Sequence, residues 1–394
     1  MKTLVKGNIH YVGVNDRHKH LFEGMWPLPY GVSYNSYLIV DEKVALVDTV
    51  DTCFFEIFLN KIKALIGDRP IDYLIINHME PDHSGSIRLI RQYYPGVTIV
   101  GNKQTFGMIE GFYGVTGERL AVTDGAELDL GHHKLRFYLT PMVHWPETMM
   151  TFDETDGVLF SGDAFGTFGA LDGGYMDTDI CLDKYWEEMI RYYSNIVGKY
   201  GTPVQKALAK LGGLPIQVIC STHGPVWTEQ IARVVGIYDR LSRYDADKGV
   251  VIVYASMYGN TEQMAEAIAA ELSAQGIKHV VLHDVSKSNP SFILKDLFKY
   301  NGLIVGSPTY CNGIYPEIEA FLQKILLREV KNRYLGYFGS FCWGGSAVKR
   351  MAEFVEKSKF TLVDNPVEMK QGMKDSVREQ CEALARSMAE HLNA

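Results

Sequence analysis

Residues 75–86 read IINHMEPDHSGS and place four potential metal ligands within six positions, namely His78, Glu80, Asp82 and His83. The apolar residues before His78 predict a strand, and the residues after the cluster predict the start of a helix. The carboxyl end of a strand is where α/β architectures place their chemistry. Imidazole and carboxylate groups without cysteine therefore predict a hydrolytic or oxygen-handling metal centre at this strand end.

Three further potential ligands each lie just past an apolar run, and these are His144, Asp163 and His223. Taken singly, each has a purely structural alternative, because a lone histidine after a strand is usually a hydrogen-bonded core or turn residue and Gly-Asp is a common turn. The repetition of one pattern at three strand ends, together with the cluster at 78–83, favours a shared metal site.

The first 248 residues contain several short apolar runs that predict strands, at 37–40, 44–47, 73–76, 97–100 and 135–139. Some of them follow one another at hairpin distance, for instance around Asp41 and Glu42, so the sequence predicts a mixed sheet. We expect a β-rich sandwich with flanking helices.

A polar break at 242–249, SRYDADKG, precedes a more regular region. We place the domain boundary there, which gives domains 1–248 and 249–394. Five β-rich runs alternate with helical segments after the break and predict a doubly wound parallel sheet, at 250–255, 279–284, 301–306, 334–340 and 360–363. Two helices present apolar stripes that can cover the sheet, through Met264, Ile268 and Leu272, and through Val377, Cys381, Leu384 and Met388.

Three loops of the C-terminal region have the composition of a ligand site. The first, SMYGNT at 256–261, joins a strand to a helix, and its free amides and hydroxyls suit a phosphate monoester. It lacks the lysine of an ATP loop and the GxGxxG pattern of a dinucleotide site. The other two, at 306–313 and 339–347, combine glycines with aromatic residues that can stack on a planar ring. The structural alternative is an ordinary turn with a buried pair of Tyr310 and Trp343.

The metal-type residues and the three loops together resemble a known family. The order of the ligands is similar to the metallo-β-lactamase superfamily, and the form His78-x-Glu80-x-Asp82-His83 resembles the flavodiiron proteins. Zinc hydrolases of that superfamily carry histidine where this chain has Glu80, and a carboxylate there suits two irons that change oxidation state. All three C-terminal loops resemble the FMN loops of flavodoxins. The resemblance spans essentially the whole chain.

The resemblance implies a metallo-β-lactamase-like αββα sandwich with a diiron site, followed by a flavodoxin-like FMN domain. One iron would be held by His78, Glu80 and His144, and the other by Asp82, His83 and His223, with Asp163 bridging; some family members turn the imidazole at the position of His83 away from the metal. The FMN residues implied are Ser256, Met257, Tyr258, Gly259, Asn260, Thr261, Pro308, Thr309, Tyr310, Asn312, Gly313, Ser340, Trp343, Gly344 and Gly345.

The implied activity is reduction of O2 to water and/or NO to N2O, with FMN as an electron reservoir for the irons. The resemblance also implies a head-to-tail homodimer. Because no cysteine-rich rubredoxin module follows the flavodoxin-like domain, we expect a separate donor such as rubredoxin or reduced coenzyme F420. Two second-sphere residues are predicted: Glu23, in a loop over the pocket, and Tyr193, as a donor to the bound gas or else a packing aromatic on its helix.

The length, charge and composition of the chain argue against several other classes of function. The chain of 394 residues has a net charge of −8, and without a basic run it does not suit a nucleic-acid surface. No signal peptide or long apolar stretch is visible, so we expect a cytoplasmic protein. The six cysteines are far apart and are predicted to be buried thiols. Two alternatives stay open, a zinc hydrolase fused to a flavodoxin-like module and an electron carrier with a degenerate metal site.

Overall fold

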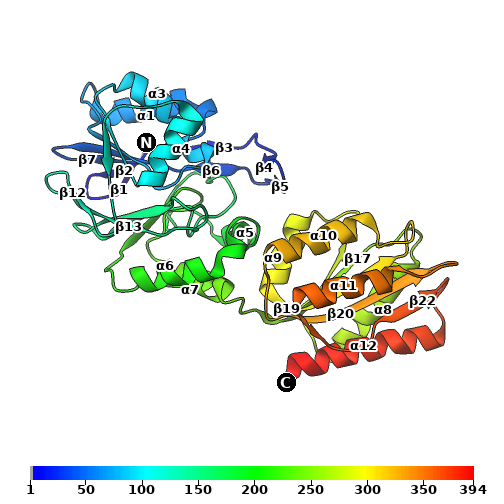
Figure 1. The fold of residues 1–394 in the computed structure, drawn as a ribbon. Helices are drawn as coiled ribbons and strands as arrows, with labels where there is room; N and C mark the ends of the chain where they lie inside the picture. The colour runs from blue at the N-terminus through cyan, green and yellow to red at the C-terminus, as the bar shows by residue number, and fades with distance from the viewer. Residues whose placement is uncertain (1–2) are drawn as a thin grey trace. The chain divides into compact units, whose positions relative to one another are not determined.

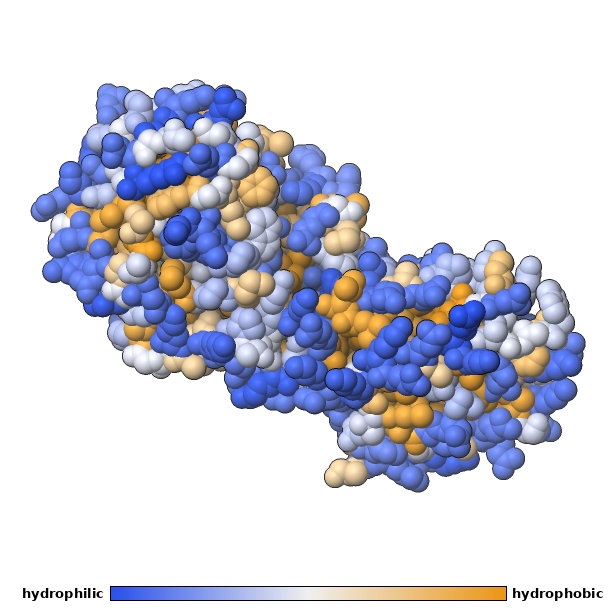
Figure 2. Space-filling model, in the orientation of Figure 1, coloured by the Kyte–Doolittle hydropathy of each residue, from blue (hydrophilic) through white to orange (hydrophobic). Residues whose placement is uncertain are grey.

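A computed structural model describes residues 3–394, which divide into two compact units, Met1–Asp239 and Arg240–Ala394 (Figure 1). The division falls within helix α7 (Ile231–Ser242) rather than after residue 248. The predicted polar break is shorter than expected, because the helix continues to Ser242 and strand β17 (Asp247–Tyr254) already begins inside the break. Polar and charged residues cover most of the face seen in Figure 2, as the net charge of −8 leads one to expect.

The N-terminal unit contains two mixed sheets, as predicted. The first has the order β1-β2-β7-β8-β9-β10-β11. Its strands are β1 (Leu4–Lys6), β2 (Ile9–Tyr11), β7 (Tyr37–Val40), β8 (Val44–Val47), β9 (Tyr73–Ile75), β10 (Thr98–Gly101) and β11 (Arg119–Ala121). β7 and β8 form the predicted hairpin around Asp41 and Glu42, whereas β8, β9, β10 and β11 run parallel.

The second sheet of this unit has the order β12-β13-β14-β15-β16. Its strands are β12 (Glu127–Asp129), β13 (Lys134–Leu139), β14 (Met149–Asp153), β15 (Val158–Gly162) and β16 (Val218–Ser221). Two short hairpins lie outside both sheets and pair β3 (Val14–Asp16) with β6 (Val32–Tyr34), and β4 (Leu21–Phe22) with β5 (Trp26–Pro27). The two sheets face each other across one apolar core that includes Ile39, Ile75, Phe137 and Phe160.

Helices flank this sandwich on both sides, which completes the αββα arrangement (Figure 1). The helices beside the first sheet are α1 (Phe55–Ile66), α3 (Ile87–Tyr93) and α4 (Lys103–Tyr113). The second sheet is followed by α5 (Asp183–Tyr192), a π-helical segment (Tyr193–Val197), α6 (Gly201–Leu211) and α7. Helix α1 shows why such helices dock here, since Phe58, Leu59 and Ile62 form one buried stripe.

The C-terminal unit is a parallel sheet in the order β18-β17-β19-β20-β21, with β22 also paired to β20. After β17 the strands are β18 (Val280–Asp284), β19 (Tyr300–Pro308), β20 (Tyr334–Phe341), β21 (Thr361–Leu362) and β22 (Val367–Lys370). All the pairings are parallel, so the doubly wound sheet is confirmed. β22 was not predicted, because its short run alternates buried and exposed residues and carries two charges.

The helices of this unit cover both faces of the sheet (Figure 1). They are α8 (Asn260–Ala274), α9 (Pro290–Lys299), α10 (Pro316–Leu327), α11 (Ala347–Ser358) and α12 (Asp375–Asn393). The predicted stripes of α8 and α12 share one core with Ile252, Ile304 and Phe338 of the sheet. This arrangement brings the ends of β17, β19 and β20 side by side.

The cysteines differ from the prediction that all six are buried. Of the six cysteines, only Cys220 and Cys381 are buried, and the other four are exposed because they lie in loops or at helix ends rather than in strands of the core. Within residues 3–394, no helix combines the length and the apolar composition needed to cross a bilayer.

Candidate metal centre and flavin loops

The residues 78–83 leave a strand and enter a helix, as the sequence predicts. β9 ends at Ile75, and the short helix α2 (Pro81–Ser84) begins at Pro81 in the first helical position. Proline is well suited to that position because its fixed φ matches the helix and its missing N–H is not needed there. The turn therefore presents His78 and Glu80 before the helix, and Asp82 and His83 within it.

The other three predicted ligands come from the second sheet. His144 lies in the connection between β13 and β14, Asp163 follows β15, and His223 follows β16. β15 and β16 are parallel neighbours, so their carboxyl ends meet at one edge of the sheet. All seven predicted ligands are brought together, and each of them is less than a tenth exposed.

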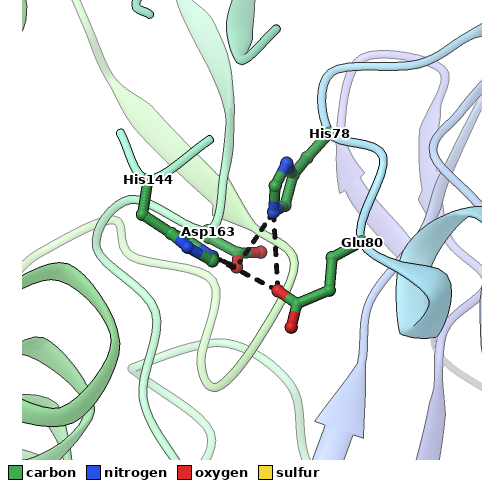
Figure 3. A group of neighbouring side chains, drawn as sticks. All are labelled: His78, Glu80, His144 and Asp163. Carbon is green, nitrogen blue, oxygen red and sulfur yellow. Dashed lines mark hydrogen bonds and ion pairs between the residues drawn. The ribbon is translucent and has the colours of Figure 1, made fainter. Parts of the chain in front are cut away.

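The first group of ligands consists of His78, Glu80, His144 and one oxygen of Asp163 (Figure 3). The Nε2 atom of His144 lies 3.2 Å from Glu80 Oε2 and 3.0 Å from Asp163 Oδ2. The Nε2 atom of His78 lies 3.5 Å from Glu80 Oε2 and 3.6 Å from Asp163 Oδ2. Figure 3 shows the four side chains pointing to one small space from two sides.

The second group consists of Asp82, His83 and His223, and it faces the other oxygen of Asp163. The Nε2 atom of His83 lies 3.4 Å from Asp82 Oδ1 and 3.0 Å from Asp163 Oδ1. The Nε2 atom of His223 lies 3.4 Å from Asp82 Oδ2 and 3.9 Å from Asp163 Oδ1. The imidazole of His83 is therefore turned toward the centre.

The chemistry of these atoms fits bound cations. Several of them are buried and have no hydrogen-bond partner among residues 3–394: Nε2 of His78, His83 and His223, Oε2 of Glu80 and both carboxylate oxygens of Asp82. Buried polar atoms are normally paired, because leaving one unpaired costs about 1–3 kcal/mol. Imidazole nitrogens and carboxylate oxygens that converge without pairing are the ligands that iron and zinc prefer.

The electrostatics of the cluster show strong coupling between the imidazoles and the carboxylates. Burial lowers the pKa of His144, but its hydrogen bond to Asp163 and its interaction with the charge of Glu80 outweigh burial and raise this pKa to about 9. Burial likewise lowers the pKa of His83, and the charges of Asp82 and Asp163 raise it to about 9. Burial raises the pKa of Asp163, but the nearby histidines hold it well below its usual range. The raised pKa values of His83 and His144 imply that metal binding would have to displace protons from these imidazoles.

Several residues that hold the cluster in place were not predicted from the sequence. Glu147 Oε1 lies 2.9 Å from His78 Nδ1 and also accepts the backbone N–H of Met79 at 2.8 Å. His223 Nδ1 lies 2.7 Å from the backbone oxygen of Ser33. Such contacts fix the orientation of a ligating imidazole and leave its other nitrogen facing the metal. The closeness of Glu147 to His144 in the sequence was the only available signal.

The tyrosine whose hydroxyl reaches the cluster is Tyr192, which donates to Asp163 Oδ2 at 2.8 Å. Thr222 donates to the other oxygen of Asp163 at 2.6 Å. The predicted residue, Tyr193, is buried and packs edge-on against Tyr238, with ring centroids 5.1 Å apart. This contact agrees with the packing alternative for Tyr193, and α5 ends at Tyr192 where the π-helical segment begins.

The predicted loop at 21–26 consists of the hairpin formed by β4 and β5. The carboxylate of Glu23 accepts a hydrogen bond from the indole N–H of Trp26 at 2.9 Å. Burial and the negative charge of Glu80 raise the pKa of Glu23, which indicates that its carboxyl group faces the cluster. Phe22 of the same hairpin packs edge-on against His223, with centroids 5.4 Å apart.

The first predicted flavin loop lies between β17 and α8. Ser256 Oγ accepts the backbone N–H groups of Gly259 at 3.1 Å and Glu262 at 3.3 Å. Gly259 has φ of 87°, a left-handed conformation that favours glycine. Thr261 shares a hydrogen bond of 2.8 Å with Ser340 of β20, which joins this loop to the neighbouring strand end. The result is a short turn at a helix N-terminus, the setting that binds phosphate.

The other two loops follow β19 and β20, although Pro308 and Ser340 still belong to these strands. Tyr310 and Gly313 exchange two backbone hydrogen bonds around Cys311 and Asn312, both of which have positive φ. The remaining members of the predicted set follow β17 (Met257, Tyr258 and Asn260), β19 (Thr309) and β20 (Trp343, Gly344 and Gly345). Tyr310 is 44% and Trp343 91% exposed, so the alternative of a buried aromatic pair is wrong.

Comparisons with known proteins agree with this geometry. The model of the ODP family beta lactamase matches residues 32–224, and the flavodoxin model matches residues 252–388. An anaerobic nitric oxide reductase flavorubredoxin from Enterobacter sp. (strain 638) is 34% identical over 373 residues, which cover 92% of this chain and 76% of the relative.

Solved structures give the same result over nearly the whole chain. Rubredoxin oxygen:oxidoreductase from the anaerobe Desulfovibrio gigas aligns with a TM-score of 0.95 and 31% identity, covering 99% of this chain and 98% of that one. The flavodiiron protein from Giardia intestinalis aligns with a TM-score of 0.95 and 27% identity, covering 99% of this chain and 96% of that one. The chain therefore belongs to the flavodiiron protein family.

Proposed function

We propose that this protein reduces O2 to water and/or NO to N2O at a non-haem diiron centre that receives electrons from FMN. The observation that carries the proposal is Asp163, because its two oxygens face two separate groups of buried imidazoles and carboxylates. One carboxylate in this position suits two cations. The names of the relatives support the same chemistry, since one is a nitric oxide reductase and another an oxygen oxidoreductase.

The proposed ligand sets follow the two groups. His78, Glu80 and His144 would hold one iron, Asp82, His83 and His223 the other, with Asp163 between them. The direction of the His83 ring supports its inclusion, since its Nε2 atom faces Asp163 and Asp82. When bound, the irons and the FMN would together supply the electrons, of which the reduction of two NO needs two and that of O2 four.

The protein's own side chains give this centre its rigidity. Tyr192 and Thr222 each donate to one oxygen of Asp163, which fixes the plane of this carboxylate. Glu147 orients His78, and the backbone of Ser33 orients His223. The ligands are also shielded from solvent, which strengthens the electrostatic interactions within the centre.

The C-terminal unit is proposed to hold the FMN. The turn around Gly259 would bind the phosphate, and the exposed rings of Tyr258, Tyr310 and Trp343 would cover the flavin. The proposed domains are residues 1–248, which would hold the diiron centre, and residues 249–394, which would hold the FMN.

The finer statements about partners rest on the family resemblance. We propose a separate protein donor such as rubredoxin, or reduced F420, and a head-to-tail homodimer or dimer of dimers. We also propose a cytoplasmic location. The solved relative from Desulfovibrio gigas is named for its use of rubredoxin, which supports a donor of this kind.

The direct test is gas consumption by the purified full-length protein. The protein is reduced anaerobically and exposed separately to O2 and to NO, with a competent donor present, while an electrode follows the gas. Turnover of at least one gas is expected. If neither gas is consumed while iron and FMN are both bound, the proposed function fails.

A further inference from the structure

A second group of ligand-type side chains lies at the other ends of the strands that carry the candidate metal centre. His133 directly precedes β13, Asp153 is the last residue of β14, and Asp156 lies in the turn before β15. Asp163 follows β15 at its far end, and a strand of five residues spans roughly 17 Å. The two groups are therefore separate sites.

The distances within this group suit a single ion. The Nδ1 atom of His133 lies 3.2 Å from Asp153 Oδ2 and 3.9 Å from Asp156 Oδ2. All three candidate ligand atoms lie within 4.8 Å of one another. Ligands that bind zinc at about 2.0–2.2 Å in a tetrahedral arrangement lie roughly 3.4 Å apart, so only small shifts are needed.

Burial distinguishes this group from an ordinary acidic surface cluster. His133 and Asp153 have fully buried side chains. Oδ2 of Asp156 is buried and has no hydrogen-bond partner among residues 3–394. Gly7, in the turn between β1 and β2, closes over the group, and a Cβ atom there would lie 2.1 Å from Asp156 Oδ2.

The local charge calls for a cation. The carboxylate of Asp41 accepts the backbone N–H groups of His132 at 2.8 Å and His133 at 2.7 Å, so a third acidic side chain lies beside the imidazole. Three carboxylates beside one neutral imidazole give the group excess negative charge, most of which a divalent ion would offset.

We propose that His133, Asp153 and Asp156 bind one divalent first-row cation, with zinc as the expected metal. One imidazole and two carboxylates are ligands that zinc accepts, and water would complete the coordination. Two of the ligands come from the turn between β14 and β15, and the third from the turn between β12 and β13. The ion would thus fasten two turns at one edge of the second sheet.

The test compares zinc content in three forms of the full-length protein. Wild type, D156N and D129N are equilibrated with zinc, passed through a desalting column and analysed for zinc and iron. Asp156 is partly exposed, so D156N is expected to fold, and Asp129 is an exposed carboxylate of the neighbouring hairpin that serves as a matched control. Wild type and D129N are expected to retain one more zinc per chain than D156N, with equal iron in all three.

Thermal unfolding provides a second readout. Zinc binds only the folded site, so it is expected to raise the unfolding midpoint of wild type and D129N by a few degrees and to leave that of D156N unchanged. Equal zinc in wild type and D156N would overturn the proposal and leave His133 in a buried ion pair only. Both readouts compare variants that share the same centre at Asp163. The difference in zinc content or unfolding midpoint therefore does not depend on which metal fills that centre.

Discussion

The two proposed cofactor sites are built in opposite ways. At the metal centre the ligands are buried, already face one another and leave ligand atoms without partners. At the flavin loops the key rings of Tyr258 and Trp343 are almost fully exposed, and the backbone turns alone are ordered by hydrogen bonds. The centre is thus prepared for small cations by charge, whereas the loops are prepared for a large planar ligand by shape and apolar surface. Changes in one site should leave the other intact.

The largest effect is expected for D163N. The amide removes the negative charge that both groups of imidazoles share, so iron binding and gas reduction should fall to background. FMN content, measured by flavin absorbance, should stay at the wild-type level. Full iron content with normal turnover in this variant would show that Asp163 does not bridge the two groups.

A smaller loss is expected for E147Q, which tests the supports around the ligands. The substitution keeps the size of the side chain but removes the charge that orients and polarises His78. Metal affinity should fall about tenfold, at the lower end of the range for such supporting residues. Competition with a chromophoric chelator would measure it, and E154Q, on a partly exposed glutamate, serves as the control.

W343A tests the difference between the two sites by changing the proposed flavin site alone. Loss of one stacking ring should weaken FMN binding by about 1 kcal/mol, or about fivefold, and should leave iron content unchanged. Fluorescence titration of flavin-free protein would measure this affinity. W343F should restore most of it, since the phenyl ring can still stack. Equal FMN affinity in wild type and W343A would remove Trp343 from the proposed site.

The smallest effect is expected for the pair Y192F and Y193F. Y192F removes the hydrogen bond to Asp163, but Thr222 still holds this carboxylate, so we expect turnover to fall by about threefold. Y193F should leave turnover close to that of wild type. A larger loss in Y193F than in Y192F would reverse the roles that the structure gives to these two residues.

The sequence predicts features that depend on neighbours along the chain. The clusters at strand ends, such as His78 and Asp163, stand out because an apolar run directly precedes them, and both sheets follow from similar local patterns. The supports of the ligands do not stand out, because Glu147 is 69 residues from His78 and Ser33 is 190 residues from His223. Only the packing of the two sheets brings these partners together.

Helix phase decides which residue of the tyrosine pair reaches Asp163. Adjacent residues of an α-helix point about 100° apart, so a shift of one position exchanges the residue that faces the cluster. No local sequence signal marks the change from α-helix to π-helix at Tyr193, so the role of Tyr192 could not be predicted. Exposure of Cys311 and Cys342 was likewise missed, because both lie in loops whose conformation depends on the proposed flavin site.

The central claim is that this centre works with iron as a reductase rather than with zinc as a hydrolase. Metal-free protein that retains FMN can be loaded with either iron or zinc, reduced anaerobically and supplied with O2 or NO at an electrode. We expect the iron-loaded form to consume gas over repeated turnovers and the zinc-loaded form to consume none. Ester or lactam hydrolysis by the zinc-loaded form, with no gas consumption by the iron-loaded form, would contradict the account.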